Sequence, residues 1–461
     1  MVDKNDQELS RVNSPRESHG DQELSRVNNV VGPYSAGHSL GTYIQVPFCQ
    51  TKCTYCNFHT GVASPSAYAP YARAVEREIT NWRALHKAAG LHSADGLVAQ
   101  GAPPFGGPPD LTYSSCPLAD TIYLGGGTPS LFDPADLAHI LDAVHSEFCP
   151  PDSGVPSSRA RAASTEATLE ADPETITAAK AAAWLAAGIN RISLGAQSFH
   201  DAELKAAGRM HRREDIFAAI NSLRSEGFAN ISLDLIAGLP YQTPASWRGS
   251  LDEALRLRPE HISIYLFEVD EGSRLGRELL AGGARYSATA VPSDDAMADS
   301  YELACERLRQ AGYDHYEISN WALPGFRSRH NLKYWRREPY LGFGAGAHSF
   351  DGRFRWANAH DPAAYAAAIE SGRLPLEQLE ELTPRQALDE ELFLGLRQLD
   401  GIDLAPIEAQ YGAQQQAQYN RLGKRIEELR AQGLVECDGS RVRLAPARLA
   451  VSNEVFVALL D

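Results

Sequence analysis

Three cysteines near residue 50 have the spacing of a metal-binding loop. Cys49, Cys53 and Cys56 lie within YIQVPFCQTKCTYCNF (residues 43–58) in a CxxxCxxC pattern. Three thiolates can hold three irons of a [4Fe-4S] cubane and leave the fourth iron open to another ligand. The alternative is a zinc site in which His59 supplies the fourth ligand, as CxxxCxxCxxH. The spacing alone leaves both sites open.

A glycine-rich segment follows one strand and one helix later. Residues 124–130 read LGGGTPS. Glycines let the backbone approach a ligand closely, and unpaired amides and carbonyls can face its amine. A glycine turn by itself is usually only a turn. A CxxxCxxC loop followed by this segment, however, resembles the radical S-adenosylmethionine (SAM) superfamily, in which the amine and carboxylate of SAM chelate the open iron. The pair of motifs therefore favours the cluster over zinc.

Further polar residues occur where predicted strands end. Taken singly, each is better explained as a surface residue or as a buried capping group. Their common placement at one face of a parallel sheet makes a ligand pocket the better joint explanation. These residues are Glu170, Gln197, Arg209 and Asp234.

The elements that position these residues follow an α/β rhythm. Short apolar runs bounded by Gly and Pro alternate with amphipathic stretches such as Tyr68–Leu85, which predicts repeated strand and helix units around a parallel sheet. Six units indicate a radical SAM-like partial (β/α)6 barrel, with ligands at the C-terminal ends of the strands. The predicted strands are Tyr43–Val46, Thr121–Leu124, Ala167–Leu169, Arg191–Leu194, Ile231–Ile236 and His261–Phe267.

The chain divides into three predicted parts. Residues 1–41 form a polar, disordered N-terminal tail with an octapeptide repeat, DQELSRVN. A mitochondrial transit peptide is the alternative, and the acidic residues of the tail argue against it. Residues 42–375 form the barrel domain with an accessory segment. Within it, Gly90–Ser115 and Cys149–Ala163 are predicted to be exposed insertions, since both are rich in Gly, Pro, Ser or Ala.

Residues 376–461 form a mostly helical C-terminal domain that resembles a winged helix. DNA binding is the functional interpretation of such a module, and the acidic chain favours a structural or docking role instead. The predicted elements are helices at Pro384–Leu399, Leu404–Tyr411 and Tyr419–Gln432, followed by a hairpin of Leu434–Glu436 and Arg441–Leu444.

Composition limits the partners and the compartment. The formal charge of −16 repels nucleic acid and acidic membranes. We find neither a run long and apolar enough to span a membrane nor an export signal. Seven cysteines, three of them crowded together, suit a reducing compartment rather than a disulfide framework. We therefore expect a cytoplasmic protein that does not bind nucleic acid.

From Thr42 to about Phe350 the sequence resembles the oxygen-independent coproporphyrinogen III oxidase-like branch of the radical SAM proteins. The resemblance continues more weakly from there to the end of the chain. The shared motifs are YIxVPFCxxxCxYCxF, GGGTPS, LGAQSF, DLIAGLP, YEISNWALPGFRSRHNLKYW and GFGAGAHS. The resemblance implies a [4Fe-4S] cluster on Cys49, Cys53 and Cys56. It also implies SAM contacts from Tyr43, Tyr55, Gly126, Gly127, Thr128, Glu170, Gln197, Arg209 and Asp234.

Two activities within this branch must be separated. The oxidases decarboxylate coproporphyrinogen III and have a fourth cysteine two positions after the third, where this chain has Phe58. The heme chaperones bind and deliver heme and have an HNxxYW pattern, which matches His330-Asn331-Leu332-Lys333-Tyr334-Trp335. His330 could ligate heme iron, or it could be satisfied inside a structural turn. The missing cysteine favours heme delivery without oxidase activity.

The resemblance also implies partners. They are heme and acceptor heme proteins, membrane-associated respiratory proteins among them; whether the chain forms a homodimer is left open. The family usually has histidine at the position of Gln45, so we assign this side chain no role. A radical SAM enzyme that modifies RNA is a third hypothesis, and the negative charge disfavours it.

Overall fold

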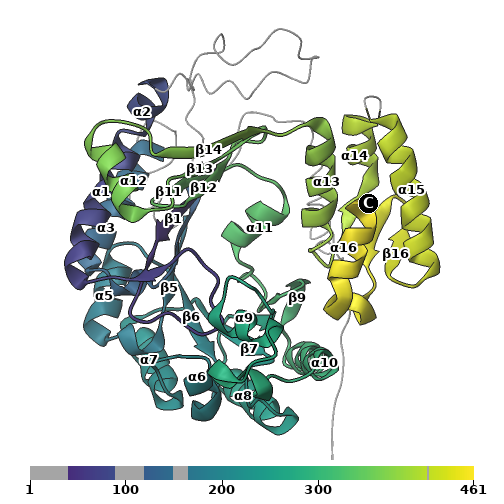
Figure 1. The fold of residues 1–461 in the computed structure, drawn as a ribbon, viewed down its shortest axis with the longest axis horizontal. Helices are drawn as coiled ribbons and strands as arrows, with labels where there is room; N and C mark the ends of the chain where they lie inside the picture. Colours follow the sequence, from purple (N-terminus) through teal and green to yellow (C-terminus); the bar gives the residue numbers. More distant parts are fainter. Residues whose placement is uncertain (1–39, 89–118, 149–164, 413–414, 461) are drawn as a thin grey trace, which may run out of the picture. The chain divides into compact units, whose positions relative to one another are not determined.

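Six parallel strands form the centre of the main sheet (Figure 1). The computed structural model describes residues 40–88, 119–148, 165–412 and 415–460. Neighbouring strands of the six are parallel, and their spatial order is the chain order. The predicted partial (β/α)6 barrel is therefore confirmed. The strands are β1 (Leu40–Val46), β4 (Ala119–Gly126), β5 (Glu166–Ala171), β6 (Arg191–Gln197), β7 (Ile231–Ala237) and β8 (His261–Leu266).

The connecting helices bury an apolar stripe against the sheet, and α8 (Pro244–Leu257) shows why they form. Thr243 and Ser246 cap its first turn reciprocally, and Trp247 and Leu251, one turn apart, are fully buried. Within the described ranges, no helix is long and apolar enough to cross a membrane. The other helices of this layer are α1 (Tyr68–Thr80), α3 (Pro134–Phe148), α5 (Ala178–Ala186), α7 (Arg213–Glu226) and α10 (Asp294–Gln310).

The first predicted helix is broken in two. We predicted one amphipathic helix over Tyr68–Leu85, but α1 ends at Thr80 and α2 (Trp82–Ala88) begins after Asn81. The backbone of Asn81 leaves the helical region, with φ −106° and ψ 9°, and its side-chain amide donates to the carbonyl of Arg77 at 2.9 Å. The backbone amide of Asn81 donates to the same carbonyl at 3.1 Å, so the side chain adds a second hydrogen bond at the helix end, a position that asparagine favours.

Shorter strands widen the sheet on both sides. On the β1 side lie β11 (Tyr340–Phe343), β12 (His348–Phe350), β13 (Phe354–Asn358) and β14 (Leu376–Glu381), and on the β8 side lie β10 (Asn320–Ala322) and β9 (Asp314–Glu317). β11 is parallel to β1, and the strands beyond it are antiparallel. The accessory segment therefore continues the barrel sheet rather than starting a separate one.

The C-terminal region has the predicted helices and hairpin. They are α13 (Pro384–Gly395), α14 (Leu404–Tyr411), α15 (Gln416–Ala431), β16 (Val435–Asp438) and β17 (Arg441–Leu444). β15 (Ile402–Asp403) and α16 (Ser452–Leu460) complete it. Arg337 forms ion pairs with Glu390 and Glu391 of α13 at 3.0 and 3.2 Å. The first residues of the predicted C-terminal domain form β14, which belongs to the large sheet. The domain start at residue 376 stays a prediction.

β1 begins before residue 41, the predicted end of the N-terminal tail. β1 begins at Leu40, which is buried, and Gly41 pairs with Thr121 of β4 and Tyr340 of β11. Leu40 pairs with Ala119 of β4, and Gly41 pairs on both sides, so both residues extend the ladder of β1. The rest of the tail and both predicted insertions lie outside the described residues.

One ionisable side chain lies wholly within this framework. The carboxylate of Glu78, on α1, accepts hydrogen bonds from the hydroxyl of Tyr365 at 2.6 Å, the amide of Gly344 at 2.8 Å and the side chain of Asn358 at 2.7 Å. It thereby ties α1 to the segments that flank β11 and β13. Burial outweighs these three donors and raises the pKa of Glu78 to about 7.

We expect Glu78→Gln to remove a pH-dependent part of the stability. Between pH 4.5 and about 7 the folded state holds a proton that the unfolded state has released, so the wild type loses stability as pH rises through this range. This rise in the pKa of Glu78 corresponds to about 3 kcal/mol of folding free energy. Urea unfolding at pH 5 and pH 8 should show that the free energy of unfolding of the variant, relative to that of the wild type, is larger at pH 8 than at pH 5. Glu76→Gln, at a half-buried position of α1, is the control. If the free energies of unfolding of the wild type and of Glu78→Gln differed by the same amount at both pH values, the expectation would be contradicted.

Candidate functional site

The C-terminal ends of the parallel strands hold the predicted site residues. β1 leads into the cysteine segment and β4 into the glycine segment. β5 and β6 contain Glu170 and Gln197 near their ends, whereas Asp234, predicted at a strand end, lies in the middle of β7. Arg209 follows the short helix α6 (Asp201–Ala206). The fold thus brings the chemistry-bearing motifs to one face of the sheet, as in other parallel barrels.

The cysteine loop, residues 49–62, is closed by a small ladder. β2 (Phe48–Cys49) and β3 (Gly61–Val62) pair in parallel, so that Cys49 stands opposite Val62. Inside the loop, the ammonium of Lys52 donates to the carbonyls of Phe58 and Thr60, each at 3.3 Å. The loop therefore has an internal structure of its own.

Backbone hydrogen bonds also anchor the cysteine loop to the barrel. The amide of Thr54 donates to the carbonyl of Ala207 at 3.0 Å, and the carbonyl of Thr54 accepts from Leu275 at 2.9 Å. Leu275 lies in α9 (Arg274–Leu280). The middle of the loop is thus held between the segments that follow β6 and β8.

The three thiols are free and half-buried. Burial raises the pKa of Cys49 and of Cys53, and hydrogen bonds from Thr60 and Thr128 to Cys49 oppose this effect. The guanidinium of Arg209 lies 3.6 Å from the sulfur of Cys53 and favours its thiolate. Each of these two thiols therefore has a neighbour that can donate to a thiolate.

The zinc site and the cluster would use the same three thiols. In the described parts of the chain no group of three or more His, Cys, Asp or Glu side chains, these thiols included, is placed to hold a metal ion, so this geometry favours neither. The ring of His59 lies against the ring of His360, with centroids 4.6 Å apart. Three thiols without a fourth protein ligand suit a cubane with an open iron better than a structural zinc ion. Ligation by these thiols stays a prediction.

The glycine segment is bonded directly to the start of the cysteine loop. The amide of Gly127 donates to the carbonyl of Val46 at 2.7 Å, and the amide of Thr128 donates to that of Phe48 at 2.8 Å. A Cβ atom on Gly127 would lie 2.4 Å from the carbonyl oxygen of Phe48. Gly126 has φ 109°, a backbone angle that residues with a side chain rarely adopt. Only glycine allows the two loops to approach this closely.

Glu170 faces this glycine turn. Its carboxylate accepts hydrogen bonds from the amide of Gly126 at 2.9 Å and from the hydroxyl of Tyr123 at 3.0 Å. Burial raises the pKa of Glu170 to about 7. A carboxylate offers about four lone-pair sites, so Glu170 retains capacity to accept from an amine or hydroxyl.

Arg209 is held by Asp172, a residue that we did not predict. Its guanidinium pairs with Asp172 and also donates to the carbonyl of Gly195 at 2.9 Å. Asp172 in turn accepts from the hydroxyl of Thr128 at 3.0 Å. The sequence signal was present, because Asp172 lies two residues after Glu170 and an extended chain points alternate side chains the same way.

Gln197 and Asp234 occupy the next two strands. Gln197 has φ 62° at a bulge where β6 departs from regular pairing with β7, which marks a locally strained residue at the strand end. The carboxylate of Asp234 accepts from the hydroxyl of Ser193 at 3.0 Å, and burial raises its pKa. Both side chains belong to the same face as Glu170.

The two predicted tyrosines differ in their surroundings. Tyr43 stacks on Tyr123 with centroids 6.0 Å apart and donates to the side chain of Gln45 at 2.9 Å, so it extends the support under Glu170. Tyr55 packs against a separate apolar cluster that includes Leu239. Burial raises the pKa of both tyrosines, which keeps both phenols neutral.

His330 is enclosed in α11 (Arg329–Trp335). Its side chain bonds through Nδ1 to the hydroxyl of Thr121 and through Nε2 to the hydroxyl of Tyr334, each at 2.9 Å. The residue is 1% exposed, and burial lowers its pKa to about 3. This arrangement is the structural turn that we set beside heme ligation. Ligation by His330 stays a prediction, and it would require one of these hydrogen bonds to break.

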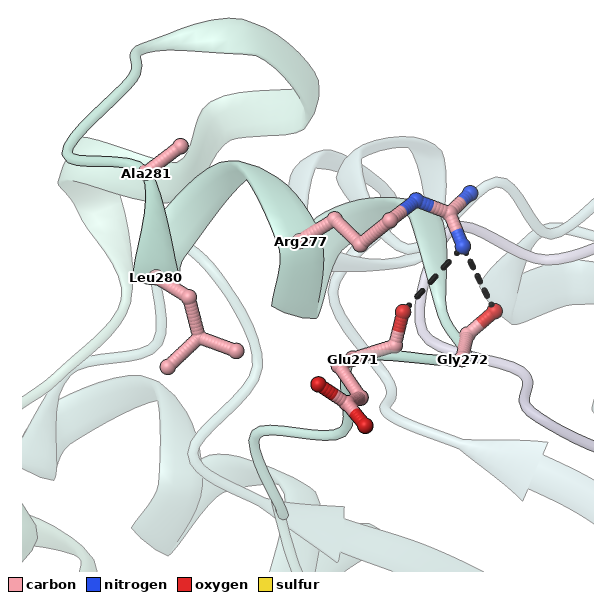
Figure 2. A pocket seen from close by; sticks show the side chains of 5 residues that line it. All are labelled: Glu271, Gly272, Arg277, Leu280 and Ala281. Carbon is pink, nitrogen blue, oxygen red and sulfur yellow. Dashed lines mark hydrogen bonds between the residues drawn. The ribbon is translucent and has the colours of Figure 1, made fainter.

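An open pocket lies beside α9 (Figure 2). The guanidinium of Arg277 is turned to the backbone and donates to the carbonyls of Glu271 and Gly272, each at 3.1 Å. Leu280 and Ala281 complete the lining. No predicted site residue lines this pocket, so it forms no part of the site.

Comparisons with known proteins identify the family. A radical SAM superfamily model matches residues 116–254, and a HemN C-terminal domain model matches residues 382–447. "Heme chaperone HemW" of Bacillus subtilis (strain 168) is 32% identical over 91% of this chain and 98% of its own length. The chain belongs to the HemW family. HemW of Mycobacterium tuberculosis (H37Rv) is 33% identical over 92% of this chain and 95% of its own length.

A solved structure agrees on the fold. Coproporphyrinogen III oxidase (HemN) from Escherichia coli, a radical SAM enzyme, superimposes with a TM-score of 0.71 over 92% of this chain and 90% of its own. At 22% identity it shows the shared architecture alone. Membership of the HemW family within the radical SAM superfamily supports a [4Fe-4S] cluster and SAM as the cofactors of this chain.

We expect Gly127→Ala to disrupt the junction between the two loops. The added Cβ would meet backbone atoms of Phe48, which can move only if the cysteine loop moves. SAM affinity, measured by equilibrium dialysis of the reconstituted protein, should fall by about tenfold or more, equal to about 1.4 kcal/mol. Gly61→Ala is the matched control, because a Cβ there would meet no atom within 4 Å. Equal SAM affinity in both variants would refute the role given to this contact.

Proposed function

We propose that this protein binds heme and delivers it to acceptor heme proteins. The observation that supports this most is the alignment with heme chaperones over nearly the whole chain, at 32% and 33% identity. The alternative, oxygen-independent coproporphyrinogen III oxidase activity, is supported only by a shared fold.

Phe58 separates the two activities. The oxidases of this branch resemble one another in a cysteine at this position, and a phenylalanine can neither ligate iron nor exchange a proton. The side chain of Phe58 is 64% exposed, so it fills no core position that would explain its presence. We take this apolar exposed residue as a mark of heme handling rather than decarboxylation.

We propose cofactor contacts for each residue of this chain that matches a motif of the family. A cluster on Cys49, Cys53 and Cys56 would leave one iron open, which the amine and carboxylate of SAM chelate. Arg209, already paired with Asp172, would bind the SAM carboxylate, and Glu170 and Asp234 would accept from the amine or ribose hydroxyls. The remaining contacts would come from Tyr43, Tyr55, Gly126, Gly127, Thr128 and Gln197.

The partners and the compartment complete the proposal. The protein acts in the cytoplasm, and its acceptors include membrane-associated respiratory proteins. The charge of −16 keeps nucleic acid out of the proposal.

We expect anaerobically purified protein to carry about four irons per chain. Replacing any of Cys49, Cys53 or Cys56 with Ala should remove the cluster absorbance. Cys305→Ala is the control, since Cys305 is a half-buried thiol of α10 whose pKa burial raises to about 12. Iron and sulfide analysis measures the outcome, and a triple variant that retained a full cluster would show the assignment to be wrong.

We expect the same preparation to bind heme and to leave coproporphyrinogen III unchanged. Heme binding is followed by spectroscopic titration, and decarboxylation by chromatography of the porphyrins formed with SAM and a reductant. Transfer of bound heme to an apo heme protein completes the test. SAM-dependent formation of protoporphyrinogen IX by the wild type would overturn the chaperone function.

A further inference from the structure

Three histidines from distant parts of the sequence gather beside the cysteine loop. His59 belongs to the loop itself, His348 begins β12, and His360 follows β13. The rings of His59 and His360 meet edge to face at 4.6 Å. His59 and His348 are exposed, and His360 is half-buried. Neither the cluster nor SAM uses any of them.

His360 is oriented as a metal-ligating histidine is. Its Nδ1 lies 3.1 Å from the carboxylate of Glu377, which also accepts from the backbone amide of His360 at 2.8 Å. A carboxylate on Nδ1 fixes the tautomer that has its lone pair on Nε2 and makes that nitrogen a better ligand. His360 is therefore prepared to coordinate through Nε2.

The cysteine loop exposes two large apolar side chains. Phe58 precedes His59 and is 64% exposed, and Val62 is 65% exposed at the other end of the same loop. Single exposed apolar side chains are ordinary on a protein surface, and these two bear on a ligand because they share one loop with His59. A flat apolar ligand would bury both while meeting an imidazole.

A cation lies within the same loop. Lys52 places its ammonium 3.3 Å from the carbonyl of Phe58. Lysine presents a compact charge on a flexible stem, which suits a carboxylate at the edge of a ligand rather than one fixed geometry. An imidazole, an apolar surface and an ammonium together match a metalloporphyrin with its carboxylate side chains.

The structure favours heme here over a bare metal ion. In the described residues no three ligating side chains form a metal site, whereas heme iron receives four nitrogens from the porphyrin and needs only one or two from the protein. We propose that His360 coordinates heme iron through Nε2, with His59 beside it and Phe58 against the macrocycle. This inference rests on the proposed heme binding and names its site.

The test uses anaerobically purified full-length protein titrated with hemin. Bound heme is quantified as the pyridine hemochrome after gel filtration, because the cluster also absorbs near the Soret band. The double variant His59→Ala/His360→Ala should bind hemin about tenfold or more weakly, the loss expected for an axial ligand. Added imidazole should restore the wild-type spin state, seen by electron paramagnetic resonance. His139→Ala, at an exposed position on α3, is the matched control.

The outcomes separate this inference from the proposed function. If the wild type binds no hemin, the proposed function and the inference both fail. If the double variant binds like the wild type while His330→Ala loses hemin with its cluster and melting temperature intact, the ligand lies in α11 and the inference alone is overturned. Weakening in the double variant, with His139→Ala unchanged and rescue by imidazole, supports it.

Discussion

Two backbone hydrogen bonds, from Gly127 to Val46 and from Thr128 to Phe48, join the loop that follows β4 to the loop that follows β1. Parallel strands bring their C-terminal ends to one edge, but only contact between the loops can fix two motifs relative to each other. The contact excludes a side chain at residue 127, since a Cβ would lie 2.4 Å from a backbone oxygen. The positions of the cysteines relative to Glu170 and Asp172 depend on this junction.

The parts of the fold that depend on local pattern were predictable. All six parallel strands and the C-terminal helices and hairpin lie where apolar runs and periodicity placed them. The break at Asn81 was missed, because one residue leaves the helical backbone region there while the apolar periodicity continues across it. The early start of β1 was missed for a similar reason: Leu40 and Gly41 are strand residues through pairing with β4 and β11, which a sequence does not display.

Within the site, residue types were predictable and their partners were not. Asp172 forms the ion pair with Arg209 and accepts from Thr128, so it connects two of the predicted site segments, although no motif includes it. His330 lies in a motif for which we kept two interpretations, a heme ligand and a structural turn. Its ring nitrogens are hydrogen-bonded to Thr121 of β4 and to Tyr334 of the same helix. The contact with Thr121 could not be predicted from the motif, and heme ligation stays a prediction.

The enclosure of His330 has a structural consequence for the cofactor site. Its ring stacks on Tyr123 at 5.1 Å, and Tyr123 donates to Glu170. Burial lowers the pKa of His330 and keeps the imidazole neutral, so it adds no charge near Glu170, whose pKa burial raises. Through Tyr123, α11 is thereby connected to Glu170, which also accepts from the amide of Gly126. A motif shared among heme chaperones thus also contributes to the packing around Tyr123 and Glu170.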